Sequence, residues 1–412
     1  MRILLLTQWF DPEPTFKGLL FAQKLQELGH EVEVVTGFPN YLEGKIYAGY
    51  RQSWCQRETI NGVRVARVPL YASHDSSAFK RLLNYFSFAA SSCLYGIFMS
   101  RKADVIYVYH PPMTVGVSGA LIGWFRRTPF VYDIQDLWPD TLKATGMIGN
   151  PRILKVAGVV CNWIYRRASH IVVLSPGFRT LLAKRGVPEK KMSVIYNWCD
   201  EAGLQVPVDA TADLSFMDGR FNVVFAGNMG KAQALESVVL AAKLVAVEDN
   251  CVQFVLVGGG VEVENLKALC ASHGVGNLRF IPRMPMKEVG AVLARADALL
   301  VHLKDDSLFS ITIPSKTQAY LAVGRPLVMA VRGDAADLVR EANAGVVAVP
   351  ENPDSLAQGV LRLARLPAHE REAMGRNAAQ FYKDKLSLSV GVAAFIKVFE
   401  QVLSSKKING KG

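Results

Sequence analysis

The chain has 412 residues, half of them hydrophobic, which allows two domains of about 200 residues each and excludes a largely disordered protein. Its six cysteines are scattered with no C-x-x-C pair, which argues against a disulfide framework or a zinc site and predicts reduced thiols. Of the net charge of +11, +10 falls in residues 1–200, so we expect that half to meet an anionic partner.

The basic first half lacks a nucleic-acid-binding motif, so the expected partner is an anionic membrane surface or a phosphorylated lipid and not nucleic acid. A plain solvated surface is the alternative. The stretch between Arg81 and Arg101 is uncharged and long enough to span a membrane, but Asn84 and several serines favour a buried or interfacial helix. The apolar run at residues 3–6 is too short for a signal peptide, so we expect a cytoplasmic protein at the inner face of the plasma membrane.

The first half alternates predicted strands and helices. MRILLLTQWF begins as a strand, an amphipathic helix follows, and EVEVVTG alternates as a second strand. Such a βαβ unit implies a parallel sheet with a right-handed crossover. Further strands are predicted at 64–68, 105–109, 130–133, 171–174 and 193–196, so residues 1–200 form a doubly wound α/β domain.

Residues 201–220 are rich in Asp, Ala and Pro without periodicity and are predicted to be a linker. A second Rossmann-like domain follows at 221–387, with strands predicted at 222–226, 251–257, 278–281, 298–302, 327–330 and 346–349. The segment 388–412 is predicted to be a helix able to pack back on the first domain, followed by a loose tail.

Polar residues in the first half gather after predicted strands, where α/β proteins bind ligands. The loop 10–18 is long for a simple connection and carries Glu13 and Lys17. His110 ends a strand and suits a base or a donor to a sugar hydroxyl, although a structural histidine is the alternative. The stretch 132–140 combines three carboxylates, including Asp136, with Trp138, which suits a sugar; a turn held by side-chain caps is the alternative.

Three turns of the second half indicate a phosphate-bearing ligand. GNMGKAQ at 227–233 and the three glycines at 258–260 follow strands and allow close approach to an anion. In FSITIPSKTQAYLAVGRPLV, Ser315 and Lys316 begin a helix whose first N–H groups and dipole favour a diphosphate. The alternative for Ser315–Gln318 is a capping box alone.

The sequence gives little evidence for a metal site or for the nucleophile motif of a hydrolase. The pair Asp305 and Asp306 stands alone on a loop, without a histidine or cysteine cluster. No Gly-x-Ser-x-Gly nucleophile elbow occurs. We therefore expect neither a metal nor a cofactor.

Several motifs together resemble the retaining GT-B glycosyltransferases of family 4, and within them the WbuB-type fucosamine transferases of bacterial O-antigen and capsule assembly. The resemblance covers nearly the whole chain and rests on FDPEPTFKGLLFAQKLQELGHEVEVVTGFPNY, DIQDLWPD, VIYNWCD, FAGNMGKAQALESVVLAA and PSKTQAYLAVGRP. It implies two Rossmann-like domains facing across a cleft. It also implies metal-independent transfer, with retention, from a nucleotide sugar on the second domain to an acceptor on the first.

The resemblance also assigns residues. Catalytic roles fall to His110 and to Lys316, which would stabilise the leaving diphosphate. The acceptor residues are Glu13, Lys17 and Asp136. The donor residues are Gly18, Asn228, Gly230, Lys231, Gln233, Arg283, Ser315, Lys316 and Gln318.

Three departures from the family pattern stand out. Ile311 and Ala319 occupy the positions of a glutamate pair that most members carry, and Gln318 is the proposed substitute for the ribose-binding glutamate. Asn228 replaces an arginine. His110 matches the strand-end histidine of the family only within one position.

The function expected from these observations is transfer of a sugar from a nucleotide diphosphate to a polyprenyl-diphosphate-linked saccharide. The resemblance suggests UDP as the nucleotide and a 6-deoxy amino sugar such as N-acetylfucosamine. Two alternatives remain open, namely a nucleotide-sugar epimerase of the same two-domain fold and a non-catalytic nucleotide-sugar-binding regulatory protein.

Overall fold

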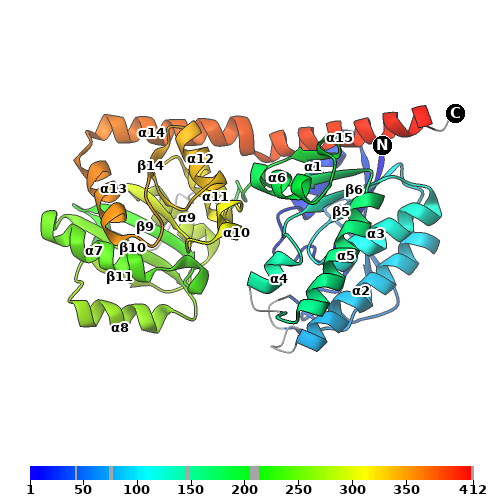
Figure 1. Ribbon diagram of the computed structural model, residues 1–412, viewed down its shortest axis with the longest axis horizontal. Helices are drawn as coiled ribbons and strands as arrows, with labels where there is room; N and C mark the ends of the chain where they lie inside the picture. Colours follow the sequence, from blue (N-terminus) through cyan, green and yellow to red (C-terminus); the bar gives the residue numbers. More distant parts are fainter. Residues whose placement is uncertain (42–43, 74–77, 145–147, 205–212, 410–412) are drawn as a thin grey trace. The chain divides into compact units, whose positions relative to one another are not determined.

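The computed structural model describes residues 1–41, 44–73, 78–144, 148–204 and 213–409 (Figure 1). The chain divides into two compact units. The first unit combines Met1–Tyr196 with Gly391–Gly412, and the second is Asn197–Val390.

The first unit is built on an eight-stranded sheet in the order β3-β4-β2-β1-β5-β6-β7-β8. Its pairs are parallel except for β3, which is antiparallel to β4. The strands are β1 (Arg2–Leu6), β2 (Glu31–Gly37), β3 (Gln56–Ile60), β4 (Val63–Val68), β5 (Val105–Tyr109), β6 (Phe130–Ile134), β7 (His170–Val173) and β8 (Met192–Val194). The helices are α1 (Leu19–Glu27), α2 (Ala78–Phe98), α3 (Met113–Arg126), α4 (Asp140–Ala144), α5 (Pro151–Arg167), α6 (Pro176–Lys184), η1 (Glu189–Lys191) and the greater part of α15 (Leu388–Asn409).

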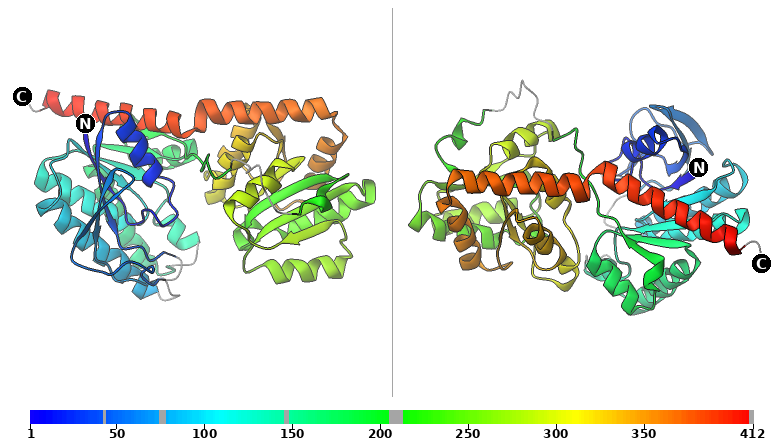
Figure 2. Two further views of the ribbon diagram at one scale, coloured as in Figure 1. Left: turned by 180° about the vertical axis from the view of Figure 1, so that it is seen from behind. Right: turned by 90° about the horizontal axis from the view of Figure 1, so that it is seen from above.

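Strand β5 shows how both faces of this sheet are covered. Because side chains alternate along a strand, Val108 lies under α3, where a side chain at Gly119 would collide with it. Tyr107 points to the other face, with its ring centroid 5.3 Å from that of Phe395 on α15 and 5.2 Å from that of Phe21 on α1. The last helix of the chain therefore lies beside α1 (Figures 1 and 2).

The second unit holds a six-stranded parallel sheet in the order β11-β10-β9-β12-β13-β14. Its strands are β9 (Phe221–Asn228), β10 (Val252–Gly259), β11 (Leu278–Ile281), β12 (Ala298–His302), β13 (Leu327–Ala330) and β14 (Gly345–Val347). Its helices are η2 (Ser215–Met217), η3 (Lys231–Gln233), α7 (Glu236–Glu248), α8 (Val263–His273), α9 (Met286–Ala294), α10 (Ser307–Ser310), α11 (Ser315–Val323), α12 (Asp334–Glu341), α13 (Pro353–Arg365), α14 (Ala368–Phe381), η4 (Tyr382–Leu386) and the first turn of α15. Strands β10, β12 and β13 are buried along most of their length and β9 along its middle, which explains their nearly continuous apolar sequences.

Each strand range predicted above lies within two residues of an observed strand at both ends. Strand β3 was missed, because the half-exposed edge sequence QRETI has no apolar run. The stretch between Arg81 and Arg101 is helical, as predicted. Within the described residues, one helical stretch, Ala368–Lys406, is apolar and long enough to cross a membrane, but the fully buried Phe395 and Phe399 in it pack inside the first unit.

Candidate functional site

The candidate site lies in the second unit, at the carboxyl edge of its sheet. There the register of β9 and β10 continues to the ends of both strands, with Gly227 opposite Gly258 and Asn228 opposite Gly259. The Met229 N–H then donates to the Gly259 carbonyl at 2.7 Å. The two glycine-rich turns are therefore held together by backbone hydrogen bonds.

The close approach of these turns explains their glycines. Gly227, Gly258 and Gly260 have positive φ angles of 143°, 136° and 152°, which residues other than glycine rarely adopt. A Cβ atom at Gly258 would collide with the Gly227 carbonyl oxygen, and one at Gly260 with the Met229 carbonyl oxygen. A side chain at either position would separate the turns.

The turn Gly230–Gln233 is held by a buried histidine that the sequence reasoning missed. His302, at the end of β12, donates from Nδ1 to the Gln233 carbonyl at 2.7 Å, and its Nε2 accepts from the Glu351 N–H at 3.3 Å. Burial lowers the pKa of His302, so the ring stays neutral and can make both bonds. The Gly230 N–H donates to Gln233 Oε1 at 3.1 Å, so this side chain closes its own turn. A strand-end histidine was the available signal, as at His110.

Helix α11 begins at Ser315, and the residue before it is Pro314. The capping-box alternative is wrong, because Ser315 is the first helical residue and α11 has no side-chain cap hydrogen bond. The amide of buried Gln318 is satisfied when its nitrogen donates to the Pro314 and Ser315 carbonyls at 2.8 and 3.0 Å. Gln318 thus contacts its own helix turn, and its role toward a ribose stays a prediction.

Lys316 projects from the first turn of α11 to the end of β9. Its Nζ lies 3.5 Å from the centre of the Phe225 ring and 3.1 Å from the position of a Cβ atom at Gly227. Among the residues that the structure describes, this Nζ has no hydrogen-bond partner, and neither has the buried hydroxyl of Thr317. Burial lowers the pKa of Lys316 to about 7. Because an ammonium buried without an anion is costly, this position favours a negatively charged ligand.

Tyr320 fixes the position of α11 against the sheet. One helical turn after Lys316, its hydroxyl accepts from the Ala226 N–H at 2.7 Å and donates to the Ala226 carbonyl at 3.3 Å. Burial raises the pKa of Tyr320, so it remains a neutral donor and acceptor. The sequence analysis missed Tyr320, although its spacing of four residues from Lys316 places both side chains on one face of a helix.

The remaining predicted donor residues of this unit lie at the same edge. Asn228 and Lys231 are exposed beside the first turn, and exposed Arg283 follows β11. Ile311 and Ala319 are half-buried before and within α11. Asp305 forms an ion pair with Arg332 at 2.9 Å, and the described residues contain no cluster of three or more potential metal ligands.

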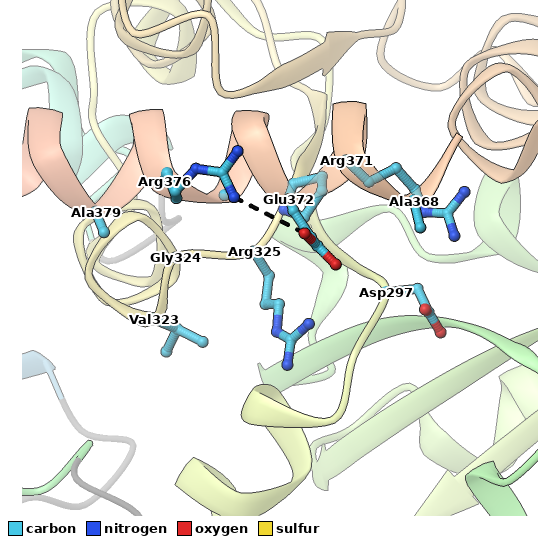
Figure 3. A pocket seen from close by; sticks show the side chains of 11 residues that line it. Asp297, Val323, Gly324, Arg325, Ala368, Arg371, Glu372, Arg376 and Ala379 are labelled. Carbon is cyan, nitrogen blue, oxygen red and sulfur yellow. Dashed lines mark ion pairs between the residues drawn. The ribbon is translucent and has the colours of Figure 1, made fainter. Parts of the chain in front are cut away.

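A separate hollow of about 450 Å³ lies at the amino edge of the same sheet (Figure 3). The arginines that line it already have partners. Arg325 donates to the Ala294 carbonyl, Arg371 donates to the Leu366 carbonyl, and Arg376 lies 3.8 Å from Glu372. Because it lies at the opposite edge of the sheet, this hollow is distinct from the site around Lys316.

In the first unit, His110 and Asp136 come together at the carboxyl edge of the sheet. The Asp136 N–H lies 3.4 Å from His110 Nδ1, and the His110 ring packs against Tyr132 and Trp138 with centroids 5.9 and 5.8 Å apart. Burial lowers the pKa of His110 to about 3 and raises that of Asp136 to about 6. His110 is thus a neutral ring and a weak base, and its use would be as a hydrogen-bond donor.

The loop 10–18 is anchored by the residues that the sequence had suggested for the acceptor. Glu13 is buried and accepts from the N–H groups of Asn40 and Tyr41 at 2.7 and 2.8 Å; burial raises its pKa, although these bonds oppose the shift. Fully buried Lys17 forms an ion pair with Asp133 at 3.0 Å, and burial lowers its pKa.

Gly18 precedes α1, and a Cβ atom there would collide with Asp11, whose carboxylate accepts from the Leu19 N–H at 2.7 Å. The geometry gives Glu13, Lys17 and Gly18 a structural part in this loop. Their roles toward a substrate stay predictions.

Comparison with known families gives two adjacent matches. Residues 19–198 match the family described as Glycosyl transferase 4-like domain, and residues 211–381 match Glycosyl transferases group 1. Each match falls largely within one of the two units.

Two relatives are similar over most of the chain. The glycosyl transferase WcaI of Escherichia coli (strain K12), named for colanic acid biosynthesis, is 28% identical over 90% of this chain and 94% of its own. The glycosyltransferase WbjE of Pseudomonas aeruginosa is 24% identical over 75% of this chain and 77% of its own.

Solved structures share the fold. Anabaena Alr3699/HepE in complex with UDP is 16% identical, with a TM-score of 0.70 over 97% of this chain and 100% of that one. Sucrose-phosphate synthase of Thermosynechococcus elongatus is 15% identical, with a TM-score of 0.68 over 98% of this chain and 99% of that one. The predicted fold of two Rossmann-like domains is confirmed as that of GT-B glycosyltransferases.

Proposed function

The chain is a glycosyltransferase with a 4-like domain followed by a group 1 domain, and we propose that it transfers a sugar from a UDP-linked donor to a lipid-linked saccharide in the synthesis of a bacterial surface polysaccharide. The single observation that carries the donor assignment is the buried ammonium of Lys316 at the start of α11, which has no hydrogen-bond partner within the described ranges. The UDP complex of Anabaena HepE and the name of WcaI support the nucleotide and the pathway class.

The diphosphate would occupy the space between the first turn of α11 and the turn after β9. The N–H groups at a helix start favour negative charge, and Lys316 adds a positive charge beside them once a bound anion favours its protonated form. As the bond to the sugar breaks, negative charge grows on the leaving diphosphate. Lys316 and these N–H groups would stabilise that charge, which lowers the barrier without a protein nucleophile.

The acceptor would meet His110 and Asp136 of the first unit. Because its Nδ1 faces the Asp136 N–H, the neutral His110 ring carries its proton on Nε2, and this N–H would donate a hydrogen bond to a sugar hydroxyl. The proposed acceptor is a polyprenyl-diphosphate-linked saccharide, which places the enzyme at the inner face of the plasma membrane. Retention at the anomeric carbon and a 6-deoxy amino sugar donor follow from the resemblance to WbuB-type enzymes and belong to the proposal.

The first experiment is a thermal-shift screen of nucleotides and nucleotide sugars on the wild type and on Lys316→Ala. A ligand that binds the native state raises the melting temperature, so we expect UDP-sugars to stabilise the wild type and not the variant. If no nucleotide stabilises either protein, the donor site is wrong. An epimerised UDP-sugar formed without any acceptor would identify the epimerase alternative instead.

A further inference from the structure

Helices α2, α3 and α5 form one layer on a single face of the first sheet (Figure 1). Thr114 Oγ1 and Ser118 Oγ of α3 donate to the Tyr85 and Ala89 carbonyls of α2 at 3.1 and 2.8 Å. On its other side α3 touches α5, where Cys161 Sγ lies 3.1 Å from Met113 Sδ. Since the three helices bury one side against the sheet and each other, their remaining sides face away from it together.

These outward sides carry large apolar side chains that the fold leaves uncovered. Along α2 they recur at helical spacing, and Phe86 and Phe98 are 59% and 74% exposed. Trp124 at the end of α3 is 64% exposed, and Val156 and Val159 of α5 are 62% and 59% exposed. Single exposed apolar residues are common, but such a group across three neighbouring helices marks an interaction surface. We call it the outer face.

The charge of the same layer selects the kind of partner. The sequences of α2, α3 and α5 contain seven basic residues and no Asp or Glu. Arg152 and Lys155 are exposed next to Val156 on the same helix. Apolar side chains with a purely basic surround fit a surface that is apolar inside and anionic outside. A second copy of the chain fits poorly, because two such basic surfaces repel each other.

We propose that the outer face docks the first unit onto an anionic lipid leaflet, with its aromatic and aliphatic side chains in the interface and its basic residues on the headgroups. Helix α2, which carries part of the outer face, also adjoins the candidate acceptor residues, since its buried Tyr85 packs against Trp138, which packs against His110. A lipid-linked acceptor would then stay in its leaflet while its saccharide reaches His110. This purpose rests on the proposed function, whereas docking itself requires neither donor nor acceptor.

The experiment is co-sedimentation of the full chain with vesicles of phosphatidylcholine alone and of equimolar phosphatidylcholine and phosphatidylglycerol. We expect binding to the anionic vesicles only, weakened by added salt. Two variants remove the two features of the face, namely Phe86→Ser with Phe98→Ser, and Arg152→Glu with Lys155→Glu. The Arg152→Glu with Lys155→Glu variant removes two basic residues, each of which contributes about 1 kcal/mol to binding an anionic surface. Because 1.4 kcal/mol corresponds to about tenfold in affinity, we expect its partition coefficient to fall about thirtyfold or more.

Matched controls make the same changes on exposed helices of the second unit. Leu244→Ser with Val247→Ser, and Lys243→Glu with Arg362→Glu, should bind vesicles like the wild type. The assignment of the face would be overturned if the outer-face variants bound anionic vesicles as strongly as the wild type. It would also be overturned if the wild type did not bind anionic vesicles. A dimer in sedimentation equilibrium that the Phe86 and Phe98 changes dissolve would show that a second copy covers the face. UDP-induced stabilisation, measured on the same samples, tests the proposed function separately.

Discussion

Replacing Lys316 by methionine should stabilise the free protein and abolish its response to UDP. Methionine keeps an unbranched apolar side chain over Phe225 and removes the buried ammonium that has no partner in the described part of the chain. The change therefore separates the stability of the fold from the proposed function of the site, because the charge that lowers the former would serve the latter.

The magnitude follows from the pKa of Lys316. Burial lowers it from 10.5 to about 7, so at pH 7 the unfolded state binds more protons than the folded state. At about 1.4 kcal/mol per pH unit, this difference lowers the free energy of unfolding by about 4 kcal/mol at pH 7, an effect that fades as the pH rises toward the unfolded pKa. For a domain of this size, each kcal/mol moves the melting temperature by about 2–4 °C.

The assay is thermal unfolding of the wild type and Lys316→Met with and without UDP, with Lys243→Met as the control on exposed α7. Without UDP we expect a higher melting temperature for Lys316→Met and no change for Lys243→Met. With UDP at about a hundred times its dissociation constant, the wild type and the control should gain about 2.7 kcal/mol, and Lys316→Met nothing. A lower melting temperature for free Lys316→Met would refute the reasoning, since the ammonium would then make favourable contacts in the folded state.

Three further predictions follow from the same geometry. UDP affinity of the wild type should fall as the pH rises above 7, because the bound diphosphate favours protonated Lys316; calorimetric titration across pH tests this, and Lys316→Met should show no such dependence. Gly258→Ala should lower the free energy of unfolding, measured in urea titrations, by about 2 kcal/mol or more, because the residue has a positive φ and the added Cβ would collide with the Gly227 carbonyl. Gly259→Ala should change it little, since nothing lies within 4 Å of its added Cβ. Asp133→Asn, which breaks a fully buried ion pair, should cost about 3–5 kcal/mol of stability, while Glu189→Gln in an exposed pair should cost less than about 1 kcal/mol in the same assay.

The sheets, and the gathering of three polar turns at the carboxyl edge of the second sheet, could be predicted because their signals are local. Buried parallel strands have continuous apolar sequences, and the turns at 227–233, 258–260 and 315–316 each follow the pattern of a strand end or helix start. The carboxyl ends of parallel strands share one edge, and the pairing of β9 with β12 in the folded sheet then brings Gly227 near Lys316.

Burial and side-chain partners could not be predicted in the same way. Lys17 and Glu13 have the composition of a substrate loop, but the fold turns both inward, onto Asp133 and onto the N–H groups after β2. His302 was overlooked because its partners, Gln233 and Glu351, are distant in sequence. Such contacts are set by tertiary packing, which periodicity and motifs do not encode.

The contribution of α15 to the first unit also bears on the order in which the chain folds during synthesis. Phe395 and Phe399 pack against Tyr107, and Phe395 lies beside Lys17, so this core is incomplete until the final helix has left the ribosome. The second unit, Asn197–Val390, is continuous in sequence and contains its own sheet. The unit begun first is therefore the one finished last, and until then its apolar α1 side needs protection from aggregation.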